Sequence, residues 1–269
     1  MPELPEVESL RRHLIKSGLV GRTIVEARLD WRKAVREPDP DTFSQAIRGR
    51  RVEGIERRAK YLLIRLDGPT LVVHLRMTGN LTMESADAEP ARTVRNAFVL
   101  DDNRELRFHD FRKLGQMWLL ADTAPLLSRL GPEPLDTDFT AEVLQSRLQR
   151  SAPIKPLLLE QDVLAGVGNI YADEALWCAK IGPLRPAQEL SVEEVTRLHQ
   201  CLRSVLTEAT DRLEDSPPFS WPSSESFKGP NVFHVPRREG EICSRCGGPI
   251  SKRTIRGRSA YFCPACQRN

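Results

Sequence analysis

The pattern of hydrophobic and polar residues changes along the chain and separates regions of different secondary structure. Near the N-terminus hydrophobic residues recur at helical spacing, which predicts a helix over residues 3–17 that ends at Gly18. From about residue 23 short β-rich runs replace this period, and turn signals such as Asp67-Gly68 separate them. The predicted strands cover residues 23–29, 54–66, 70–77, 96–100, 104–109 and 116–121. Short strands at such spacing favour an antiparallel sandwich or barrel.

A second change of pattern follows the segment Gly131-Pro132-Glu133-Pro134, whose two prolines predict a linker. Helical periods then predict helices over residues 139–149, 154–161, 170–179 and 191–213. Residues 215–231 are rich in Ser and Pro without a clear period, which predicts a loop. The last segment, from about residue 232, contains four cysteines in two short stretches typical of hairpins.

Length and composition exclude some classes of protein. A chain of 269 residues suggests two domains with a small appendage. No run of eighteen apolar residues occurs, so no membrane span is expected. The first residues lack the order of a signal peptide, so we expect an intracellular protein whose thiols stay reduced.

The net charge of +3 is unevenly distributed. The segment from Arg237 to the C-terminus holds eight basic residues and only two acids, Glu239 and Glu241. A basic tail on a nearly neutral chain suits a polyanion such as nucleic acid. Charge alone does not separate this interpretation from a solvated basic surface.

Four cysteines have the spacing of a metal site. Cys243-x-x-Cys246 and Cys263-x-x-Cys266 are separated by sixteen residues, as in tetrahedral Cys₄ zinc sites. The alternative, two disulfides, requires an oxidising compartment for which the sequence gives no signal. Four protein ligands leave no open position, so the zinc ion is expected to be structural. The other two cysteines, Cys178 and Cys201, lie in predicted helices and are expected to be ordinary core thiols.

The N-terminal Met1-Pro2-Glu3 holds a candidate nucleophile. Removal of Met1 would leave Pro2 with a secondary amine, and an α-amino group has a pKa of about 8, against about 10.4 for lysine. A larger fraction of such an amine is uncharged at neutral pH and can attack carbon. The alternative is that Pro2 is only a start residue.

The whole set of motifs resembles the formamidopyrimidine-DNA glycosylase and endonuclease VIII family. The matching segments are PELPEVE (2–8), RRAKYLL (57–63), HLRMTG (74–79), GPEPL (131–135), GVGNIYADEALW (166–177) and the four-cysteine segment. The resemblance implies an α+β multidomain protein: a catalytic antiparallel β-sandwich domain with a leading helix (1–131), a helix–two-turn–helix DNA-binding domain (132–231) and a zinc-finger hairpin (232–269). It is closest to the formamidopyrimidine branch.

The resemblance also implies roles for single residues. Pro2 would be the nucleophile, Glu3 the acid/base group and Lys60 the active-site lysine. Phosphate contacts would come from His74, Lys155, Asn169 and Arg258, and Met77, Arg112 and Leu114 would fill the space of a flipped nucleotide. Taken alone, several of these residues have simpler interpretations: Lys60 as a surface lysine, His74 as a core histidine and Asn169 as a helix cap. Glu6 is expected either to hold the terminus or to be a solvated helix acid.

Two departures from the family pattern concern the choice of base. Leu114 stands where the family usually has phenylalanine, so an aromatic stacking face is lost. The stretch from Glu214 to Ser226 lacks the glycines of the family's loop that caps an oxidised purine. Both put base specificity in doubt and leave the chemistry at the sugar unchanged.

The predicted function is a bifunctional DNA glycosylase and abasic-site lyase. It would remove oxidised purines (8-oxoguanine and formamidopyrimidines) and cleave the strand by β,δ-elimination through a proline iminium. The partner would be damaged double-stranded DNA, the cofactor one structural zinc, and the protein a nucleoid-associated cytoplasmic monomer. The alternatives are the same chemistry with oxidised pyrimidines or mainly abasic sites as substrates, or a zinc-finger DNA-binding protein without catalysis.

Overall fold

The structure is a computed structural model that describes residues 1–214 and 233–268. The described residues form two compact units: Met1–Ser128 with residues 210–214, and Arg129–Ala209 with residues 233–268. The loop expected over residues 215–231 lies outside the described residues.

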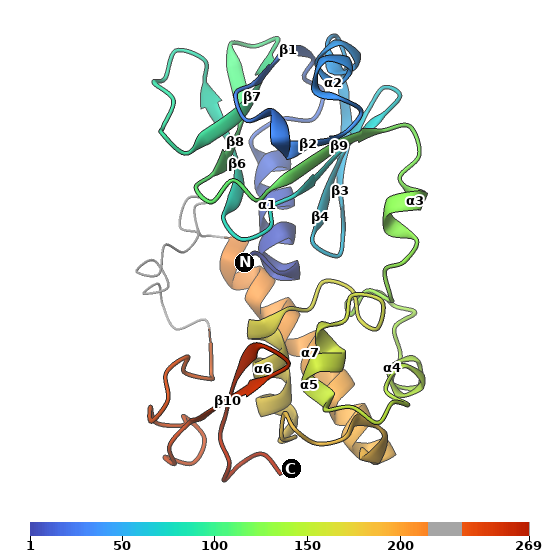
Figure 1. Ribbon diagram of the computed structural model, residues 1–269, viewed down its shortest axis with the longest axis vertical. Helices are drawn as coiled ribbons and strands as arrows, with labels where there is room; N and C mark the ends of the chain where they lie inside the picture. Colours follow the sequence, from blue (N-terminus) through green and yellow to red (C-terminus); the bar gives the residue numbers. More distant parts are fainter. Residues whose placement is uncertain (215–232, 269) are drawn as a thin grey trace. The chain divides into compact units, whose positions relative to one another are not determined.

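The first unit is built on two β-sheets (Figure 1). Its elements are α1 (Leu4–Lys16), β1 (Ile24–Leu29), η1 (Arg32–Ala34), β2 (Val35–Glu37), α2 (Pro40–Ile47), β3 (Val52–Arg58), β4 (Tyr61–Leu66), β5 (Thr70–His74), β6 (Gly79–Ser85), β7 (Val94–Leu100), β8 (Arg104–Asp110), β9 (Gln116–Leu120) and α3 (Ala124–Leu127). The strand orders are β1-β7-β8-β6 and β2-β9-β5-β4-β3. Adjacent strands are antiparallel except β2 and β9, which run parallel.

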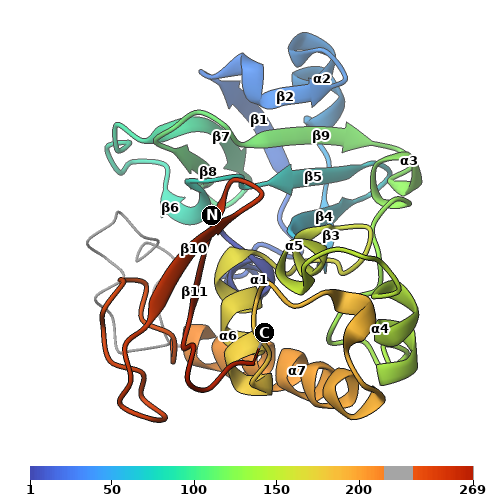
Figure 2. The ribbon, with the colours of Figure 1, turned by 60° about the horizontal axis from the view of Figure 1, so that its bottom comes forward.

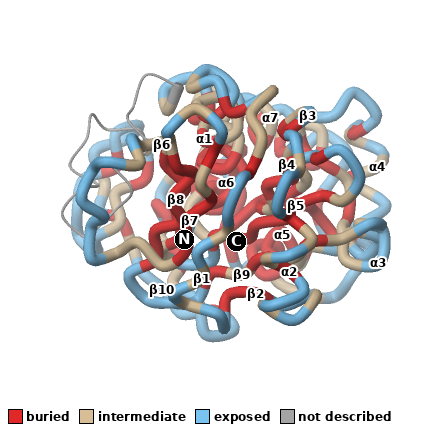
Figure 3. Tube along the Cα trace, turned by 90° about the horizontal axis from the view of Figure 1, so that it is seen from above, coloured by how far each residue is buried: buried red, intermediate tan, exposed pale blue. Residues whose placement is uncertain are grey.

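A single hydrophobic core joins both sheets to α1. Alternate residues of the strands, such as Leu62 and Ile64 of β4 and Leu106 and Phe108 of β8, are at most 1 % exposed. Helix α1 contacts β3 and β4 of one sheet and β6 of the other. Its hydrophobic face is therefore packed against both sheets. Figure 3 colours the buried residues of the chain red. Burial of each such side chain contributes about 1.5–3 kcal/mol, which fixes the helix against the sheets.

The predicted strand over residues 54–66 is a hairpin. It divides into β3 and β4, joined by Ala59 and Lys60, and Ala59 has a φ of 53°. Ala59 and Lys60 are not typical turn residues, so the sequence gave no sign of the turn. Strand β6 and helix α2 were not predicted either. Helix α2 does carry a start signal, because Asp39 accepts hydrogen bonds from the backbone N–H groups of Asp41 and Thr42 and Pro40 begins the helix.

The second unit combines helices with one β-hairpin (Figure 2). Its elements are α4 (Ala141–Arg147), α5 (Ile154–Leu159), α6 (Asn169–Ala179), η2 (Ala187–Glu189), α7 (Val192–Glu214), β10 (Ser251–Ile255) and β11 (Arg258–Phe262), and the last residues of α7 belong to the first unit. Helix α6 packs against α5 on one side and β11 on another. These elements confirm the predicted helices, the C-terminal hairpin and the α+β fold class.

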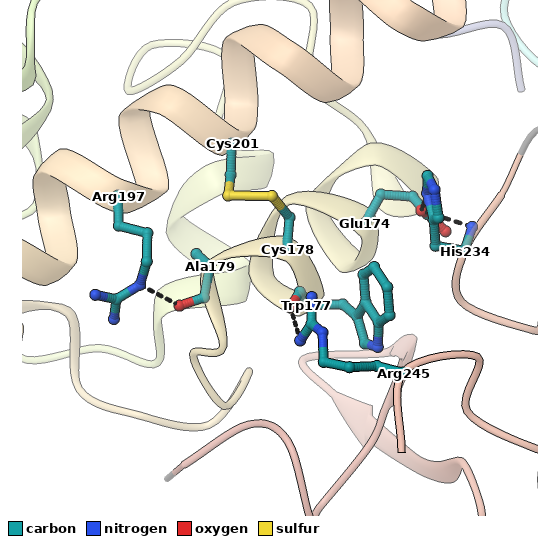
Figure 4. The surroundings of a disulfide bond; sticks show 8 residues. All are labelled: Glu174, Trp177, Cys178, Ala179, Arg197, Cys201, His234 and Arg245. Carbon is teal, nitrogen blue, oxygen red and sulfur yellow. Dashed lines mark hydrogen bonds and ion pairs between the residues drawn. A yellow bond between two sulfur atoms is a disulfide. The ribbon is translucent and has the colours of Figure 1, made fainter. Parts of the chain in front are cut away.

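Cys178 and Cys201 are joined by a disulfide, so the prediction of two ordinary core thiols was wrong (Figure 4). The bond links α6 to α7, with the two Cα atoms 5.8 Å apart. The pairing depends on how two helices cross, and nothing in the local sequence of either helix shows this.

Among the helices that the structure describes, none has the length and apolar character of a membrane span.

We expect Gly79→Ala, at the start of β6, to destabilise the first unit. A Cβ at this position would lie 2.4 Å from the carbonyl oxygen of Leu75, a backbone atom that cannot move aside alone. The free energy of unfolding should fall by about 1–3 kcal/mol in urea titrations followed by circular dichroism. Gly54→Ala in β3 is the matched control, since its Cβ meets nothing within 4 Å, and it should change stability by less than about 0.5 kcal/mol. Equal effects of the two variants would contradict the prediction.

Candidate functional site

The beginning of α1 holds the chain terminus in place. Pro2 and Glu3 are buried, and the backbone N–H of Glu3 donates to Glu6 Oε2 at 2.7 Å. The Glu3 carboxylate in turn accepts from the backbone of Glu6, which completes a capping box. The expectation that Glu6 holds the terminus is therefore confirmed. Met1, by contrast, is 43 % exposed.

Lys60 lies in the tight turn between β3 and β4, and this turn is tied to α1. Glu8 of α1 accepts from Arg57 Nε at 3.2 Å and from Arg11 at 2.7 Å. The guanidinium of Arg57 also donates to the carbonyl oxygen of Ala59, the residue before Lys60. Although burial opposes it, Arg11 and Arg57 lower the pKa of the Glu8 carboxyl, so it is ionised at neutral pH. Lys60 itself is only 6 % exposed, a placement that does not fit a plain surface lysine.

His74 ends β5 opposite Tyr61 of β4, next to Lys60. Its ring meets the Tyr61 ring edge to face at 4.7 Å, and its Nδ1 accepts from the backbone N–H of Arg76 at 3.1 Å. The proton of the neutral ring is therefore on Nε2. Burial first, then the charges of Arg76 and Lys60, lowers the pKa of His74 to about 3. The ring is neutral at physiological pH and can donate one hydrogen bond to an anion.

Asp110 holds two loops together, and these loops carry the three residues expected to fill a void in DNA. One carboxylate oxygen accepts from Thr78 Oγ1, beside Met77, at 2.5 Å and from the backbone N–H of Arg112 at 3.2 Å. The other accepts from the N–H groups of Leu114 and Gly115, both at 2.6 Å. Asp110 is 1 % exposed, so the loops are fixed from within.

The side chains that these loops present to solvent are apolar and cationic. Met77 is 41 % exposed and Leu114 43 % exposed, and Arg112 is exposed as well. Phe111 is 75 % exposed, more than any other large hydrophobic residue among those described. Several exposed apolar residues gathered on loops that one carboxylate holds together are typical of a contact surface.

In the second unit, Asn169 opens α6 after the glycine loop 166–168. Gln161 holds that loop, because its side chain donates to the carbonyl of Val167 at 2.9 Å and accepts from the N–H of Gly166 at 3.0 Å. Within the described chain the Oδ1 atom of Asn169 is buried without a hydrogen-bond partner. This oxygen is an acceptor and cannot bind an anion, so the anion-binding feature here is the N-terminus of α6, where the helix dipole favours negative charge.

Lys155 is buried, at 1 % exposure, and joins three elements of the second unit. Its ammonium lies 2.7 Å from Asp173 Oδ1 of α6 and donates to the carbonyl oxygen of Ser259 in β11 at 2.6 Å. Asp173 also accepts from Arg237 at 2.5 Å and from the backbone N–H of Tyr261 at 3.1 Å. Burial raises the pKa of Asp173, and the charges of Lys155 and Arg237 oppose that shift. These contacts fix the hairpin on α6.

The hairpin of β10 and β11 presents cations at its turn. Arg256 and Gly257 both have positive φ, at 45° and 77°, as a two-residue hairpin turn requires. Lys252, Arg253, Arg256 and Arg258 are all exposed. Arg258 directly precedes Ser259, whose carbonyl Lys155 holds.

The four cysteines of the finger form a metal centre. The sulfurs of Cys243, Cys246, Cys263 and Cys266 lie within 4.8 Å of one another, as four thiolates around one ion require. Trp177 of α6 donates from Nε1 to Cys243 Sγ at 3.4 Å. Although burial opposes it, donors led by the Trp177 indole lower the pKa of Cys243 to about 6, which favours the thiolate that binds metal.

Sequence profiles match nearly the whole chain. Residues 1–117 match the formamidopyrimidine-DNA glycosylase N-terminal domain, residues 130–217 the formamidopyrimidine-DNA glycosylase H2TH domain, and residues 240–269 a zinc finger found in FPG and IleRS. The chain belongs to the formamidopyrimidine-DNA glycosylase family, whose members are DNA-repair enzymes. The finger match and the sulfur geometry together assign one structural zinc ion to the four cysteines.

Full-length relatives agree with this assignment. The formamidopyrimidine-DNA glycosylase of Herpetosiphon aurantiacus is 47 % identical, covering 99 % of this chain and 100 % of its own. That of Geobacillus kaustophilus is 42 % identical over 100 % of both chains. Among solved structures, the Lactococcus lactis FPG in complex with FAPY-dG-containing DNA is 33 % identical, with a TM-score of 0.88 over 99 % of this chain and 100 % of its own.

The structure places the predicted residues in two sets. The first unit brings Lys60 beside His74 and sets Met77, Arg112 and Leu114 on the loops that Asp110 supports. In the second unit, Lys155 binds Ser259, the residue after Arg258, and Asn169 lies on α6, the helix that also carries Asp173. Sequence reasoning missed Asp110, Gln161 and Phe111. An Asp directly after a strand and an aromatic residue beside Arg112 were the only available signals.

The depressed pKa of His74 predicts a pH effect on stability. The native state keeps the ring neutral, whereas the unfolded chain binds a proton below its ordinary pKa of about 6.5, so stability is lost as pH falls. Between about pH 7 and about pH 5 this group should remove about 1–2 kcal/mol from the free energy of unfolding. Urea titrations of the wild type and of His74→Gln at several pH values measure the difference. A wild-type pH slope that the substitution leaves unchanged would refute the assignment.

Proposed function

We propose that the protein is a bifunctional DNA glycosylase and abasic-site lyase that uses Pro2 as its nucleophile. The single observation that carries the proposal is the buried N-terminus of α1, where Pro2 precedes the capping box of Glu3 and Glu6. A chain end is ordinarily mobile. Here removal of Met1 would expose a secondary amine held in a fixed position, with an acidic residue beside it.

The chemistry follows from the secondary amine. Its attack on the sugar C1′ forms a C–N bond and expels the damaged base, which takes up a proton. The C1′–O4′ bond then breaks as O4′ takes up a proton, and the opened sugar carries an iminium ion. This ion has no N–H to lose, so its positive charge persists and acidifies the C2′ hydrogens. Loss of one C2′ proton expels the 3′ phosphate, and a further elimination releases the 5′ phosphate. Glu3 moves protons in these steps as general acid and base.

The cationic and hydrogen-bonding groups hold the DNA backbone in this proposal. In the first unit, Lys60 and the Nε2–H of His74 bind phosphate near the sugar. In the second, the side-chain NH₂ group of Asn169 donates to a phosphate at the N-terminus of α6, and Arg258 inserts its guanidinium from the hairpin turn. Lys155 was expected to contact phosphate directly, but its ammonium is buried beside Asp173, so in this proposal it instead supports Arg258 by fixing Ser259.

Reaction at C1′ requires the damaged nucleotide to flip out of the base stack. Protein side chains then fill the position that it leaves in the duplex. Met77, Arg112 and Leu114 occupy that position in the proposal, since Asp110 fixes the loops that expose them. The domains would follow the boundaries 1–131, 132–231 and 232–269, and the working form would be a nucleoid-associated cytoplasmic monomer.

Oxidised purines are the favoured substrates. The N-terminal PELPEVE segment belongs to the formamidopyrimidine branch, and the Lactococcus protein that this chain resembles was solved with FAPY-dG-containing DNA and with DNA containing an abasic site. A preference for oxidised pyrimidines or for abasic sites is the second candidate, favoured by Leu114 and by the stretch from Glu214 to Ser226. Most of that stretch lies outside the described residues. Cleavage of a panel of duplexes with single lesions separates the two.

Borohydride trapping on a duplex with one abasic site tests the nucleophile. The wild type should form a covalent adduct because hydride reduces the iminium to a stable amine, and Pro2→Gly should lose most of the adduct. Electrophoresis under denaturing conditions measures it. Glu53→Gln on β3, an exposed acid outside the proposed site, is the control and should trap like the wild type.

Mass spectrometry of the same sample must show that Met1 is removed, since a retained Met1 blocks the amine. Absence of an adduct with the trimmed wild type would overturn the proposal. It would leave a zinc-finger DNA-binding protein without catalysis as the alternative.

A further inference from the structure

We propose that Cys178 and Cys201 are an oxidisable dithiol whose disulfide locks the part of α6 that carries the zinc finger. The two residues lie on different helices with Cα atoms 5.8 Å apart, within the range that a disulfide spans. Cys178 is partly exposed, whereas Cys201 is 7 % exposed. The pair therefore combines one thiol that solvent can reach, Cys178, with a buried thiol, Cys201, that lies next to it. This inference does not depend on the proposed catalytic mechanism.

The residues on either side of Cys178 connect α6 to its neighbours (Figure 4). The Trp177 ring stacks on His234 at 5.3 Å and lies under the guanidinium of Arg245 at 3.8 Å, so both partners come from the finger segment. Its indole N–H also reaches Cys243, a zinc ligand. The last turn of α6, which carries Trp177, is thus the part of the helix that contacts the zinc-finger segment.

The same turn is fixed to α7 from the opposite direction. Arg197 of α7 donates from Nε to the carbonyl oxygen of Ala179 at 2.7 Å, next to the disulfide (Figure 4). Breaking the disulfide leaves this hydrogen bond and apolar packing to hold the turn. Forming it adds a covalent bond at Cys178, the residue that follows Trp177, which contacts the zinc ligand Cys243.

Hydrogen peroxide is the class of oxidant that the proposal names. The Cys178 thiolate attacks one peroxide oxygen, the O–O bond breaks, and a sulfenic acid and hydroxide result; the hydroxide takes up the proton that the thiol had released and becomes water. The Cys201 thiolate then attacks the sulfenic sulfur, forms the S–S bond and expels hydroxide, which takes up a proton to become water. Two thiols and one peroxide give one disulfide and two waters, so the two electrons lost by sulfur reduce the peroxide.

The cross-link should stabilise the second unit. It closes a loop with a sequence separation of 23 residues, and the lost entropy of the unfolded chain corresponds to a rise in Tm of about 10 °C. Zinc release should also slow, by about tenfold. In this proposal the zinc-finger segment separates from Trp177 only when the last turn of α6 unfolds locally, and the disulfide opposes that unfolding.

The experiment compares wild type with Cys178→Ala/Cys201→Ala, both loaded with zinc. Each is prepared reduced and after one equivalent of peroxide, and peptide mapping identifies any disulfide. Tm is measured by calorimetry, and transfer of zinc to a colorimetric chelator gives the release rate. The double variant controls for oxidation of the zinc thiolates, because it keeps those four cysteines alone.

The proposal expects a Cys178–Cys201 peptide in oxidised wild type, a higher Tm and slower zinc release, with no such gains in the double variant. Failure to form this disulfide overturns it. So does a disulfide that leaves both measurements unchanged, or an equal response of the double variant.

A different observation carries a second inference, which rests on the proposed function. We infer that Phe111 supplies the aromatic stacking face that Leu114 lacks. Phe111 is 75 % exposed in a turn that is tightly fixed, since Asp110 binds the N–H groups of Arg112, Leu114 and Gly115. An aromatic ring held out in water on a rigid turn is positioned for a partner rather than for the core.

The surroundings of Phe111 identify that partner as nucleic acid. Arg112 and Lys113 follow it directly and are exposed, and the Lys113 ammonium lies 4.6 Å from the centroid of the Trp31 ring. Cations beside an exposed aromatic ring suit a phosphate backbone with stacked bases. Phe111 therefore stacks on a base next to the position that the flipped nucleotide leaves.

Duplexes with a stable abasic-site analogue and 2-aminopurine in the opposite strand test this contact. Phe111→Ala should weaken binding by about tenfold and reduce the fluorescence change of 2-aminopurine, the loss of one base stack. Phe111→Trp should retain both. Val25→Ala on β1, which removes another exposed apolar residue that has no proposed role in binding, is the control and should behave like the wild type.

Failure of the inference and failure of the proposed function give different results. Wild type that binds and is trapped by borohydride, with Phe111→Ala equal to it in affinity and fluorescence, overturns only the role of Phe111. Wild type that is not trapped overturns the proposed function itself.

Discussion

Burial of α1 against both sheets is the constraint on which the first unit and its candidate site depend. Leu4, Val7, Leu10 and Leu14 are at most 1 % exposed, so a chain end that would ordinarily fray is packed like a core element. The capping box then fixes the first turn of the helix. Glu8 binds Arg57, and Arg57 binds the carbonyl oxygen of Ala59, so the turn that holds Lys60 is fixed to the same helix. Pro2, the proposed nucleophile, and Lys60 are thus positioned by one helix.

Two buried carboxylates do comparable work elsewhere. Asp110 gathers backbone donors from one loop and a hydroxyl from another, so the residues that face the duplex in the proposal sit on a rigid support. Asp173 does the same with Lys155, Arg237 and the backbone of Tyr261, and so fixes the hairpin to α6. A buried carboxylate is costly unless it is paired in this way, and once it is paired its partners are fixed as well. Neither residue contacts DNA in the proposal, yet each sets the position of residues that do.

Several elements of the fold could be predicted from local signals. The helix over residues 3–17, most strands and the four later helices carry their own periodicity, and the zinc site carries its ligand spacing. The hairpin at Lys60 was hidden because its turn, Ala59-Lys60, lacks the usual turn residues. Strand β6 and helix α2 were missed although each is longer than elements that were predicted, such as β9 and α5. The exposure of Phe111 and the burial of Lys155 were equally hidden, since both depend on which way a side chain faces.

The sequence by itself determined which chemical groups the protein has: a proline that trimming can expose, the acid beside it, four zinc ligands and a basic C-terminal segment. These are properties of residue type and short spacing, and they do not depend on folding. Tertiary structure alone decided which groups meet. Cys178 meets Cys201 across a separation of 23 residues, and Lys155 meets Ser259 across 104, because helix crossing and strand docking bring them together. Such contacts are products of packing, and no local pattern in either segment encodes them.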